Sequence, residues 1–345
     1  MAASPQPIIA SPASVKRSRG IGPALALFFT APLVAEFLLG DLPVSLLPAL
    51  IVLAPMYGGG ALLIRESARR WARGWPTILM LGMAFALLEE AFTTQSLFNP
   101  DYLHLHLNLL QPAYIPALGI GARWTLWMLN VHPIWSIAVP IALIEASVPR
   151  RSQTPWLGPA GYIVLCIVFA AGLAAMTRLT YRGDHFTASP LQFTCAGIVT
   201  LLLIVSAFLL PQRPAPNPPP SNLRPPSYWV TGILALAAGS AALLIPLQWG
   251  WWGFAANLAL DLLMLFTVLT WSRRPHWTSL HTLSLAAGAT LAYAWHSFIQ
   301  LPVVGKPDLS LRLGDALFSL AAIGLITLAA RRTAKAEAVS PQTSS

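Results

Sequence analysis

Charged residues are scarce in this sequence. Asp, Glu, Lys and Arg together make up 10% of its 345 residues, whereas a soluble domain carries about 25%. Hydrophobic residues make up 56%. A chain of this length could not cover a water-facing surface with so few charges, so a soluble fold is excluded. The composition predicts an integral membrane protein whose main partner is the lipid bilayer.

Cysteine is also rare. The two cysteines, Cys166 and Cys195, both lie in apolar stretches and form no CxxC motif, so neither a disulfide framework nor a redox pair is expected. The net charge of +9 comes from short basic clusters between apolar runs. A nucleic-acid partner is therefore not expected, because no basic stripe with interleaved aromatic residues is present.

Apolar runs long enough to cross a membrane recur along the chain. A spanning helix needs about 20 mostly apolar residues. The runs predict an all-α, polytopic transmembrane helical bundle of about ten spans, at residues 23–40, 44–64, 77–98, 123–147, 157–177, 190–210, 228–247, 251–272, 278–300 and 313–330.

Lys and Arg indicate the sidedness of these spans. With both termini in the cytoplasm, 16 of the 21 basic residues fall on the inner side. The five on the outer side are Arg123, Arg178, Arg182, Lys306 and Arg312. Such an excess of inner basic residues is the usual signature of membrane orientation. We therefore expect a multi-pass protein, in the cell membrane, with both ends inside.

Proline divides the chain. Residues 211–227 hold eight prolines in seventeen positions, which predicts an extended cytoplasmic linker because proline interrupts helices. The linker separates a six-span bundle at 23–210 from a four-span bundle at 228–331. The polar ends, residues 1–22 with their basic cluster and residues 332–345, are expected to be disordered tails.

The third span carries two adjacent carboxyl groups, Glu89 and Glu90. A charge at the centre of a spanning helix is costly, so each is a candidate functional group. Two adjacent carboxylates at low dielectric cannot both ionise cheaply, and one should hold a proton. Such a pair suits acid–base catalysis or proton relay. The alternative is structural: one Glu bonds a neighbouring helix and the other faces a water pocket. Thr93 continues the polar stripe one turn later.

His132 on the fourth span is expected at nearly the same depth as the glutamates, counting about 1.5 Å per residue. Trp135 and Ser136 lie on its face of the helix, and the indole could wall a pocket. Glu89, Glu90 and His132 are therefore the candidate catalytic residues, on two antiparallel spans that should face each other. A histidine that only bonds a neighbouring helix is the alternative.

Further polar residues lie inside or beside the spans. Glu36, Asn257 and Asp261 could form a polar path with the glutamates, or they could hold helices together. Gln95 and Asn99, where the third span ends, are expected to cap it and position the following loop.

The outer loop at 98–122 contains His104 and His106 in an HxH pattern with Asp101 nearby. This is a weak candidate for a metal pair. Alternating leucines suggest instead that the loop packs over the membrane face. The histidines of the spans do not share a depth, which argues against haem. We expect no cofactor and no metal in the candidate catalytic site.

The Glu89–Glu90 pair followed by His132 on the next span resembles the CPBP glutamate intramembrane proteases, the CAAX-processing and bacteriocin-processing group. That family carries EExxxR, then FxxxH and HxxxN motifs. The resemblance implies metal-independent peptide hydrolysis, with Glu89 as general base, Glu90 as its neighbour and His132 as its partner. His296 with Gln300 would be a loose counterpart of the last motif. Thr94 and Met128 depart from the family pattern.

Two other classes remain open from the sequence. A proton- or cation-coupled transporter would place its carboxyl groups along a path. A non-catalytic scaffold would use the same groups to hold its helices together. The contact between Glu89 and His132, and the course of the remaining carboxyls, should separate these classes.

Overall fold

Helices follow the apolar runs of the sequence. The structure, a computed structural model, describes residues 21–210 and 223–339. Each of the ten predicted spans is occupied by helix, which confirms the all-α class. Most of the expected N-terminal tail, residues 211–222 of the proline-rich linker, and residues 340–345 lie outside the described residues.

The α-helices are α1 (Ile21–Pro32), α2 (Leu50–Leu53), α3 (Gly59–Arg70), α4 (Trp75–Leu87), α5 (Ala122–Val131), α6 (Val139–Ser147), α7 (Pro159–Asp184), α8 (Pro190–Leu209), α9 (Tyr228–Leu244), α10 (Gly250–Ser272), α11 (Ser279–His296) and α12 (Leu309–Val339). Four π-helical segments interrupt or end them: η1 (Leu33–Phe37), η3 (Ala54–Gly58), η4 (Leu88–Thr93) and η6 (His132–Ala138). Short 3₁₀ turns are η2 (Val44–Ala49), η5 (Tyr102–His104), η7 (Pro149–Arg151) and η8 (Leu247–Trp249).

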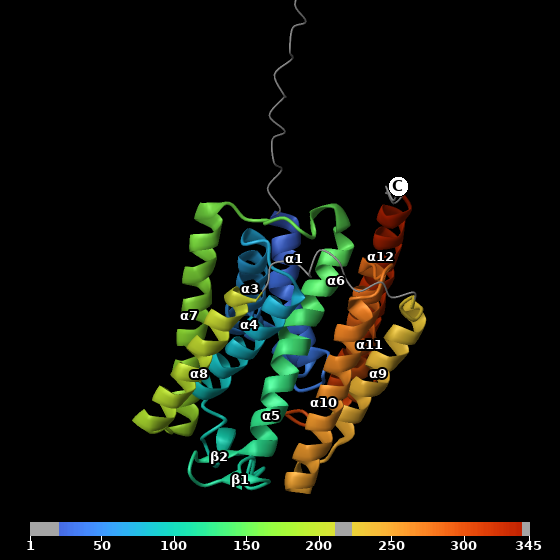
Figure 1. Ribbon diagram of the computed structural model, residues 1–345. Helices are drawn as coiled ribbons and strands as arrows, with labels where there is room; N and C mark the ends of the chain where they lie inside the picture. Colours follow the sequence, from blue (N-terminus) through green and yellow to red (C-terminus); the bar gives the residue numbers. More distant parts are fainter. Residues whose placement is uncertain (1–20, 211–222, 340–345) are drawn as a thin grey trace, which may run out of the picture.

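Seven helical segments of the described chain are long and apolar enough to cross a membrane. Two shorter apolar helices, Ile21–Phe37 and Tyr228–Leu244, accompany them. The start of α1 and the end of α12 lie at the same end of the bundle (Figure 1). An even number of crossings would give that arrangement, and with α11 (Ser279–His296) added to these nine segments the helices agree with the ten predicted spans.

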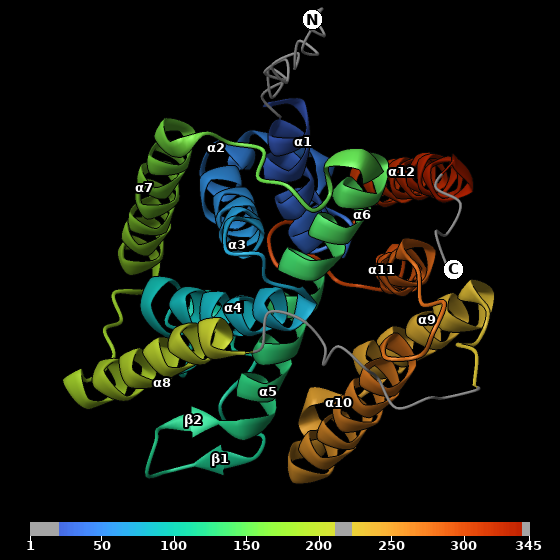
Figure 2. The same cartoon turned by 45° about the horizontal axis from the view of Figure 1, so that its top comes forward.

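The bundle has a buried centre and a lipid-facing periphery. In the segment Ala122–Ser147, 78% of the apolar window is buried, against 11% for Pro159–Asp184, Pro190–Leu209 and Leu247–Ser272. Figure 2 shows α7 and α8 on one side of the bundle and α9 and α10 on another. The central segments are the ones that carry Glu89, Glu90 and His132, so the fold isolates these groups from lipid.

Helices on both sides of the proline-rich linker pack together. α11 contacts α9, and both α11 and α12 contact α6. Trp135 in η6 donates a hydrogen bond from Nε1 to the carbonyl of Ala289 in α11 at 2.8 Å. Residues before and after the linker therefore share one helical core.

The third span is shorter than predicted. η4 ends at Thr93 rather than at residue 98, and Gln95 takes a positive φ of 58°. That left-handed backbone turns the chain away from the helix. Residues 94–99 are nevertheless buried, so irregular backbone packs inside the protein at this point, where side chains can satisfy it.

The last helix is longer than predicted. α12 continues to Val339, whereas the sequence suggested a disordered tail from residue 332. Thr333 donates from Oγ1 to the carbonyl of Ala146 at 3.0 Å, and Arg332 donates from Nη1 to the carbonyl of Ser147 at 2.9 Å. These bonds hold the end of α12 against the end of α6. α1 likewise begins at Ile21, two residues before the predicted start.

The outer segment between α4 and α5 forms a small hairpin. β1 (Tyr114–Ile115) pairs antiparallel with β2 (Ile120–Gly121), and Tyr114 lies opposite Gly121. Figure 1 places this hairpin at the end of the bundle opposite the start of α1.

Candidate functional site

His132 and Glu90 meet at the centre of the bundle. Nε2 of His132 lies 2.8 Å from Oε1 of Glu90, and Nδ1 lies 3.2 Å from Oε2 of Glu89. Exposed fractions of 1% for Glu89 and 6% for both Glu90 and His132 show that the three are buried. The contact expected between the third and fourth spans is therefore present. Their catalytic role stays a prediction.

Hydroxyl groups complete the hydrogen bonding of Glu90. Its Oε2 accepts from Oγ1 of Thr94 at 3.0 Å and from Oγ of Ser96. Oγ of Ser96 also accepts from the indole of Trp124 at 3.0 Å. The Glu90 carboxyl is thus held on both oxygens, by His132 on one and by two hydroxyls on the other.

Tyr57 links a third carboxyl to the group. Its hydroxyl interacts electrostatically with both Glu36 and Glu89, and its ring stacks near the His132 imidazole, with centroids 6.1 Å apart. Glu36 interacts electrostatically with His132 and Glu90. We call Glu36, Tyr57, Glu89, Glu90 and His132 the acid–base cluster.

Each member of the acid–base cluster comes from a π-helical segment. Glu36 lies in η1, Tyr57 in η3, the two glutamates in η4 and His132 in η6. These are the four π-helical segments of the described residues. π-Bulges occur often at functional sites, because they redirect side chains that a regular helix would point elsewhere.

The sequence supplies a local cause for each π-segment. Pro32 directly precedes η1, Pro55 lies within η3 and Pro133 within η6. Proline cannot donate to the preceding turn and its ring crowds the carbonyl four residues back, so the regular ladder breaks there. In η4, Thr93 and Thr94 donate from their hydroxyls to the carbonyls of Leu88 and Glu89, each at 3.1 Å. These bonds support the wider turn.

One polar atom of the cluster is left over. Oε2 of Glu89 is buried and has no hydrogen-bond partner, although Nδ1 of His132 lies 3.2 Å away. That nitrogen instead lies within hydrogen-bond distance of Oγ of Ser136, also at 3.2 Å. A buried carboxylate oxygen without a donor can accept a proton or coordinate a cation.

The same three residues match the geometry of a metal site. One ligand atom each from Glu89, Glu90 and His132 lie within 4.8 Å of one another. Two carboxylates and an imidazole form a ligand set that suits divalent zinc or iron. His104 and His106 do not form such a group among the described residues. They instead flank Asp101 at the surface, at 3.1 and 2.9 Å.

The supporting residues predicted around the site have other contacts. Thr93 bonds its own helix, while Thr94, one residue later, reaches Glu90. Trp135 does not wall the acid–base cluster in the way suggested. Its indole bonds α11, and its ring stacks on Tyr293 at 4.5 Å. The side chain of Trp135 therefore packs against α11.

Gln95 and Asn99 position the segment after the third span, but the backbone of Thr94 rather than either side chain caps the end of η4. Oε1 of Gln95 accepts from the backbone N–H of Ala188 at 2.7 Å. Nδ2 of Asn99 donates to Asp184 at 2.7 Å. Both contacts attach the segment after η4 to the connection between α7 and α8.

The predicted polar path is only partly present. Glu36 belongs to the acid–base cluster, but Asp261 accepts hydrogen bonds from Asn130 at 2.9 Å and from Asn257 at 3.3 Å. Asp261 and Asn257 therefore join α10 to α5. The sequence offered these groups as one polar path but gave no information on which helices are neighbours.

A different carboxyl, Asp41, extends the path away from the acid–base cluster. Asp41, in the loop between η1 and η2, interacts electrostatically with Glu36. Its Oδ1 accepts from Nε2 of Gln300 at 2.8 Å. Burial, with Glu36 as a second cause, raises the pKa of Asp41 to about 7.

His296 lies four residues before Gln300 but contacts Trp295, and its Nδ1 has no hydrogen-bond partner.

Sequence reasoning missed Tyr57, Ser96 and Asp41. Tyr57 stands in an apolar run before three glycines, and Ser96 follows the end of its helix. Proline inside an apolar run, at positions 32, 55 and 133, was the available signal, because it marks where a spanning helix deviates.

Comparisons with known proteins agree with the membrane class. The chain matches, over residues 25–339, the model of a family described as an uncharacterised membrane protein family. No curated protein and no solved structure matches it significantly. The match is not to a family of CPBP proteases, so the resemblance to that group drawn from Glu89, Glu90 and His132 is wrong. An adjacent glutamate pair with a histidine on the next span is a short pattern that unrelated spans can share. The chain belongs to this uncharacterised membrane protein family, which covers nearly all of its length.

Proposed function

We propose that this protein is a cation-coupled transporter of the cell membrane, whose coupling ion is held by the acid–base cluster. The ion is a proton or a metal cation. One observation carries the proposal: four π-helical segments bring three carboxyls, one imidazole and the Tyr57 hydroxyl together inside the membrane bundle.

The net charge of the acid–base cluster favours a bound proton or cation. If Glu36, Glu89 and Glu90 are all ionised, even a protonated His132 leaves the cluster at −2, three negative charges against one positive. Uncompensated charge is expensive in a low-dielectric interior. Protons or a bound cation must therefore neutralise it, and the partner-less Oε2 of Glu89 is a position where either could reside.

The arrangement of the carboxyl groups, which continue from the cluster to a loop, also favours ion transport. Tyr57 connects Glu89 to Glu36, Glu36 neighbours Asp41, and Asp41 contacts Gln300 in the loop after α11. Carboxyls in sequence from a buried cluster to a loop are typical of an ion pathway. A scaffold would need only closed pairs, like the one between Asp261 and Asn130.

Carbodiimide labelling tests whether the cluster binds a cation. Dicyclohexylcarbodiimide reacts with protonated carboxyls in apolar surroundings, and peptide mass spectrometry locates the product. In membrane vesicles we expect labelling of Glu36, Glu89 or Glu90, decreasing as the pH rises. Zn²⁺ that binds the cluster should slow it. Glu145, held by two arginines, is the internal control and should stay unlabelled.

Labelling at no cluster carboxyl at any pH, in folded protein, would overturn the proposal and favour the scaffold. Proteoliposomes test the transport step itself. A pH-sensitive dye inside the vesicles should report proton entry with the wild-type protein, reduced at least tenfold in Glu89→Gln/Glu90→Gln. Asp101→Asn, at the exposed loop, is the matched carboxyl control. Metal-driven rather than proton-driven transport would appear as uptake of Zn²⁺ or Mn²⁺ with the same dependence on the glutamates.

One contact favours a second candidate, hydrolysis within the membrane. The Glu89 oxygen that lacks a donor lies 3.2 Å from His132. A carboxylate beside an imidazole can take a proton from water as the water oxygen attacks a carbonyl carbon. Mapping of new peptide N-termini in membranes that contain wild-type protein or Glu89→Gln separates the two. Termini that depend on Glu89 would favour hydrolysis, and their absence would favour transport.

A further inference from the structure

A basic pocket lies where α6 and α12 end together. Its lining consists of Val148, Pro149, Arg150, Arg151, Arg332, Lys335 and Ala336, and its volume is about 390 Å³. Four of these seven residues are cationic, and the lining includes no carboxylate among the described residues. The volume lies within the range of about 300–1,000 Å³ that is typical of small-molecule sites.

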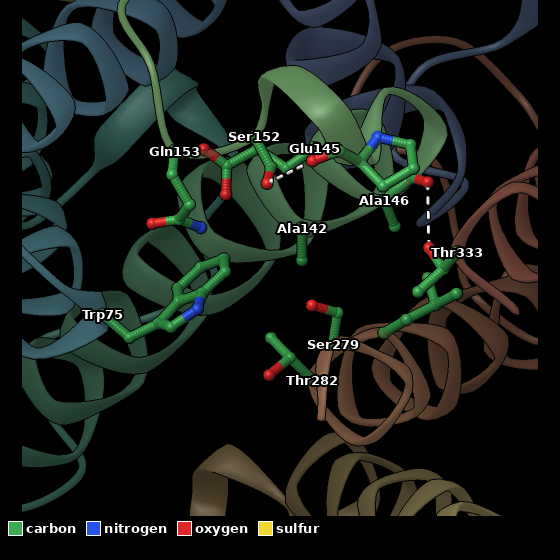
Figure 3. A pocket seen from close by; sticks show the side chains of 11 residues that line it. Trp75, Ala142, Glu145, Ala146, Ser152, Gln153, Ser279, Thr282 and Thr333 are labelled. Carbon is green, nitrogen blue, oxygen red and sulfur yellow. Dashed lines mark hydrogen bonds between the residues drawn. The ribbon is translucent and has the colours of Figure 1, made fainter. Parts of the chain in front are cut away.

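The fold assembles this pocket from two distant parts of the chain. Arg150 and Arg151 follow α6, whereas Arg332 and Lys335 lie in the last turns of α12. Hydrogen bonds from Arg332 to Ser147 and from Thr333 to Ala146 fix the two helix ends together. Figure 3 shows the bond between Thr333 and Ala146 at the edge of a smaller neighbouring pocket, which shares Pro149 with the basic one.

Two carboxylates on the helices that form the pocket, Glu145 and Glu337, bond groups outside its lining. Glu145 accepts from Arg65 at 3.0 Å and from Arg69 at 2.7 and 2.8 Å. Glu337 accepts from the backbone N–H of Leu280 at 3.3 Å, which directs it toward α11. Arg150 and Lys335 are exposed. The pocket therefore presents positive charge to the surroundings.

The location of the pocket indicates where its ligand comes from. Both helix ends are on the side that the Lys and Arg distribution assigns to the cytoplasm. Leu328 and Leu317 precede Lys335 by seven and eighteen residues, so they share its face of α12, and they are 41% and 55% exposed. A lipid-facing apolar strip thus leads directly to the pocket.

We propose that the basic pocket binds the phosphate headgroup of an anionic phospholipid of the cytoplasmic leaflet, with the acyl chains along the Leu317–Leu328 face of α12. Basic pockets between spanning helices on the cytoplasmic side suit such headgroups. The negative phosphate pairs with Arg332 and Lys335 at the end of one helix and with Arg150 at the end of the other. A bound lipid then joins the two halves of the bundle.

The test compares two double variants in full-length protein. Arg150→Gln/Lys335→Gln removes two charges from the pocket lining. Arg273→Gln/Arg331→Gln removes two exposed charges expected on the same membrane side but outside the lining. Binding of phosphatidylglycerol to protein in phosphatidylcholine nanodiscs should weaken about 25-fold in the first variant, because each basic residue contributes about a fivefold factor. In the second it should change less than twofold.

Three results would overturn the lipid proposal. Equal loss in both variants would show general surface attraction and overturn it, as would wild-type binding no stronger than that of phosphatidylcholine. Inorganic phosphate and glycerol phosphate in phosphatidylcholine nanodiscs form the third arm. If either displaces phosphatidylglycerol at equal concentration, the site binds a free phosphate and the lipid assignment fails. Circular dichroism of both variants checks that they remain folded.

Discussion

Nε2 of His132 lies 2.8 Å from Oε1 of Glu90, a residue 42 positions earlier on the preceding span. Both residues sit in π-helical segments, which turn their side chains toward each other across the core. The contact joins the two spans whose apolar windows are the most buried of the seven, at 67% for Trp75–Thr93 and 78% for Ala122–Ser147.

Loss of the imidazole should destabilise the protein. His132→Gln leaves two buried carboxyls without a cationic partner, and breaking a buried pair from one side costs about 3–5 kcal/mol. Unfolding in mixed micelles, followed by circular dichroism, measures the free energy. His104→Gln, at an exposed position, is the histidine control and should change stability by about 0.5 kcal/mol or less. Equal effects would mean that the cluster contributes no stability.

Trp135→Phe should affect packing and leave the acid–base cluster unchanged. The variant keeps a ring to stack on Tyr293 but loses the bond to the Ala289 carbonyl, which costs about 1 kcal/mol. Carbodiimide labelling of the cluster glutamates should equal that of the wild type. Altered labelling would show that the indole acts on the cluster after all.

The end of the bundle where α3 and α6 finish depends on Glu145. Its carboxylate pairs with Arg65 at 3.0 Å and with Arg69 at 2.7 Å, and all three side chains are buried. Glu145→Gln leaves both guanidinium groups short of their counter-charge, so we expect a loss of about 3 kcal/mol in unfolding free energy. Glu337→Gln, which loses one bond to a backbone N–H, should cost less than half as much. The reverse order would contradict the assignment of this network.

The outer loop should depend on pH. The bond to Asp101 raises the pKa of His104, and the same bond lowers the pKa of Asp101. The protonated His104 therefore stabilises the loop below its usual pKa of about 6.5, and this stabilisation is lost as the pH rises through the raised pKa. The ionised carboxyl of Asp101 stabilises the loop above its usual pKa of about 3.9, and this stabilisation is lost as the pH falls through the lowered pKa.

Hydrogen exchange of residues 102–106, corrected for intrinsic rates, checks this behaviour. Protection should be greatest between about pH 4 and 6.5 and should decrease on either side. Asp101→Asn should make the profile flat. Protection that rises steadily toward alkaline pH would rule out the pair as its cause.

The sidedness of the membrane is still a prediction. Reporter fusions after residue 110, in the loop before the hairpin, and after residue 218, in the proline-rich segment, should report opposite sides, with the second in the cytoplasm. A common side for both would invalidate the ten-span topology and the cytoplasmic position of the basic pocket.

The sequence by itself determined the membrane class, the positions of the helices and the depth of Glu89, Glu90 and His132. These follow from apolar run length and from a constant rise per residue, which depend only on local order in the chain. Proline positions also marked three of the four π-segments, because the missing N–H acts locally.

Only the tertiary structure decided which polar groups are neighbours. Glu36, Tyr57 and Ser96 join the site while Asp261 pairs with Asn130, although the sequence offered Glu36 and Asp261 as members of one polar path. Likewise, Arg150 and Lys335 line one pocket although 185 positions separate them. The rotation of a helix about its axis and the choice of its neighbours come from packing summed over the whole bundle. Counting residues along one span gives depth, but it gives neither the rotation of the helix nor the identity of its neighbours.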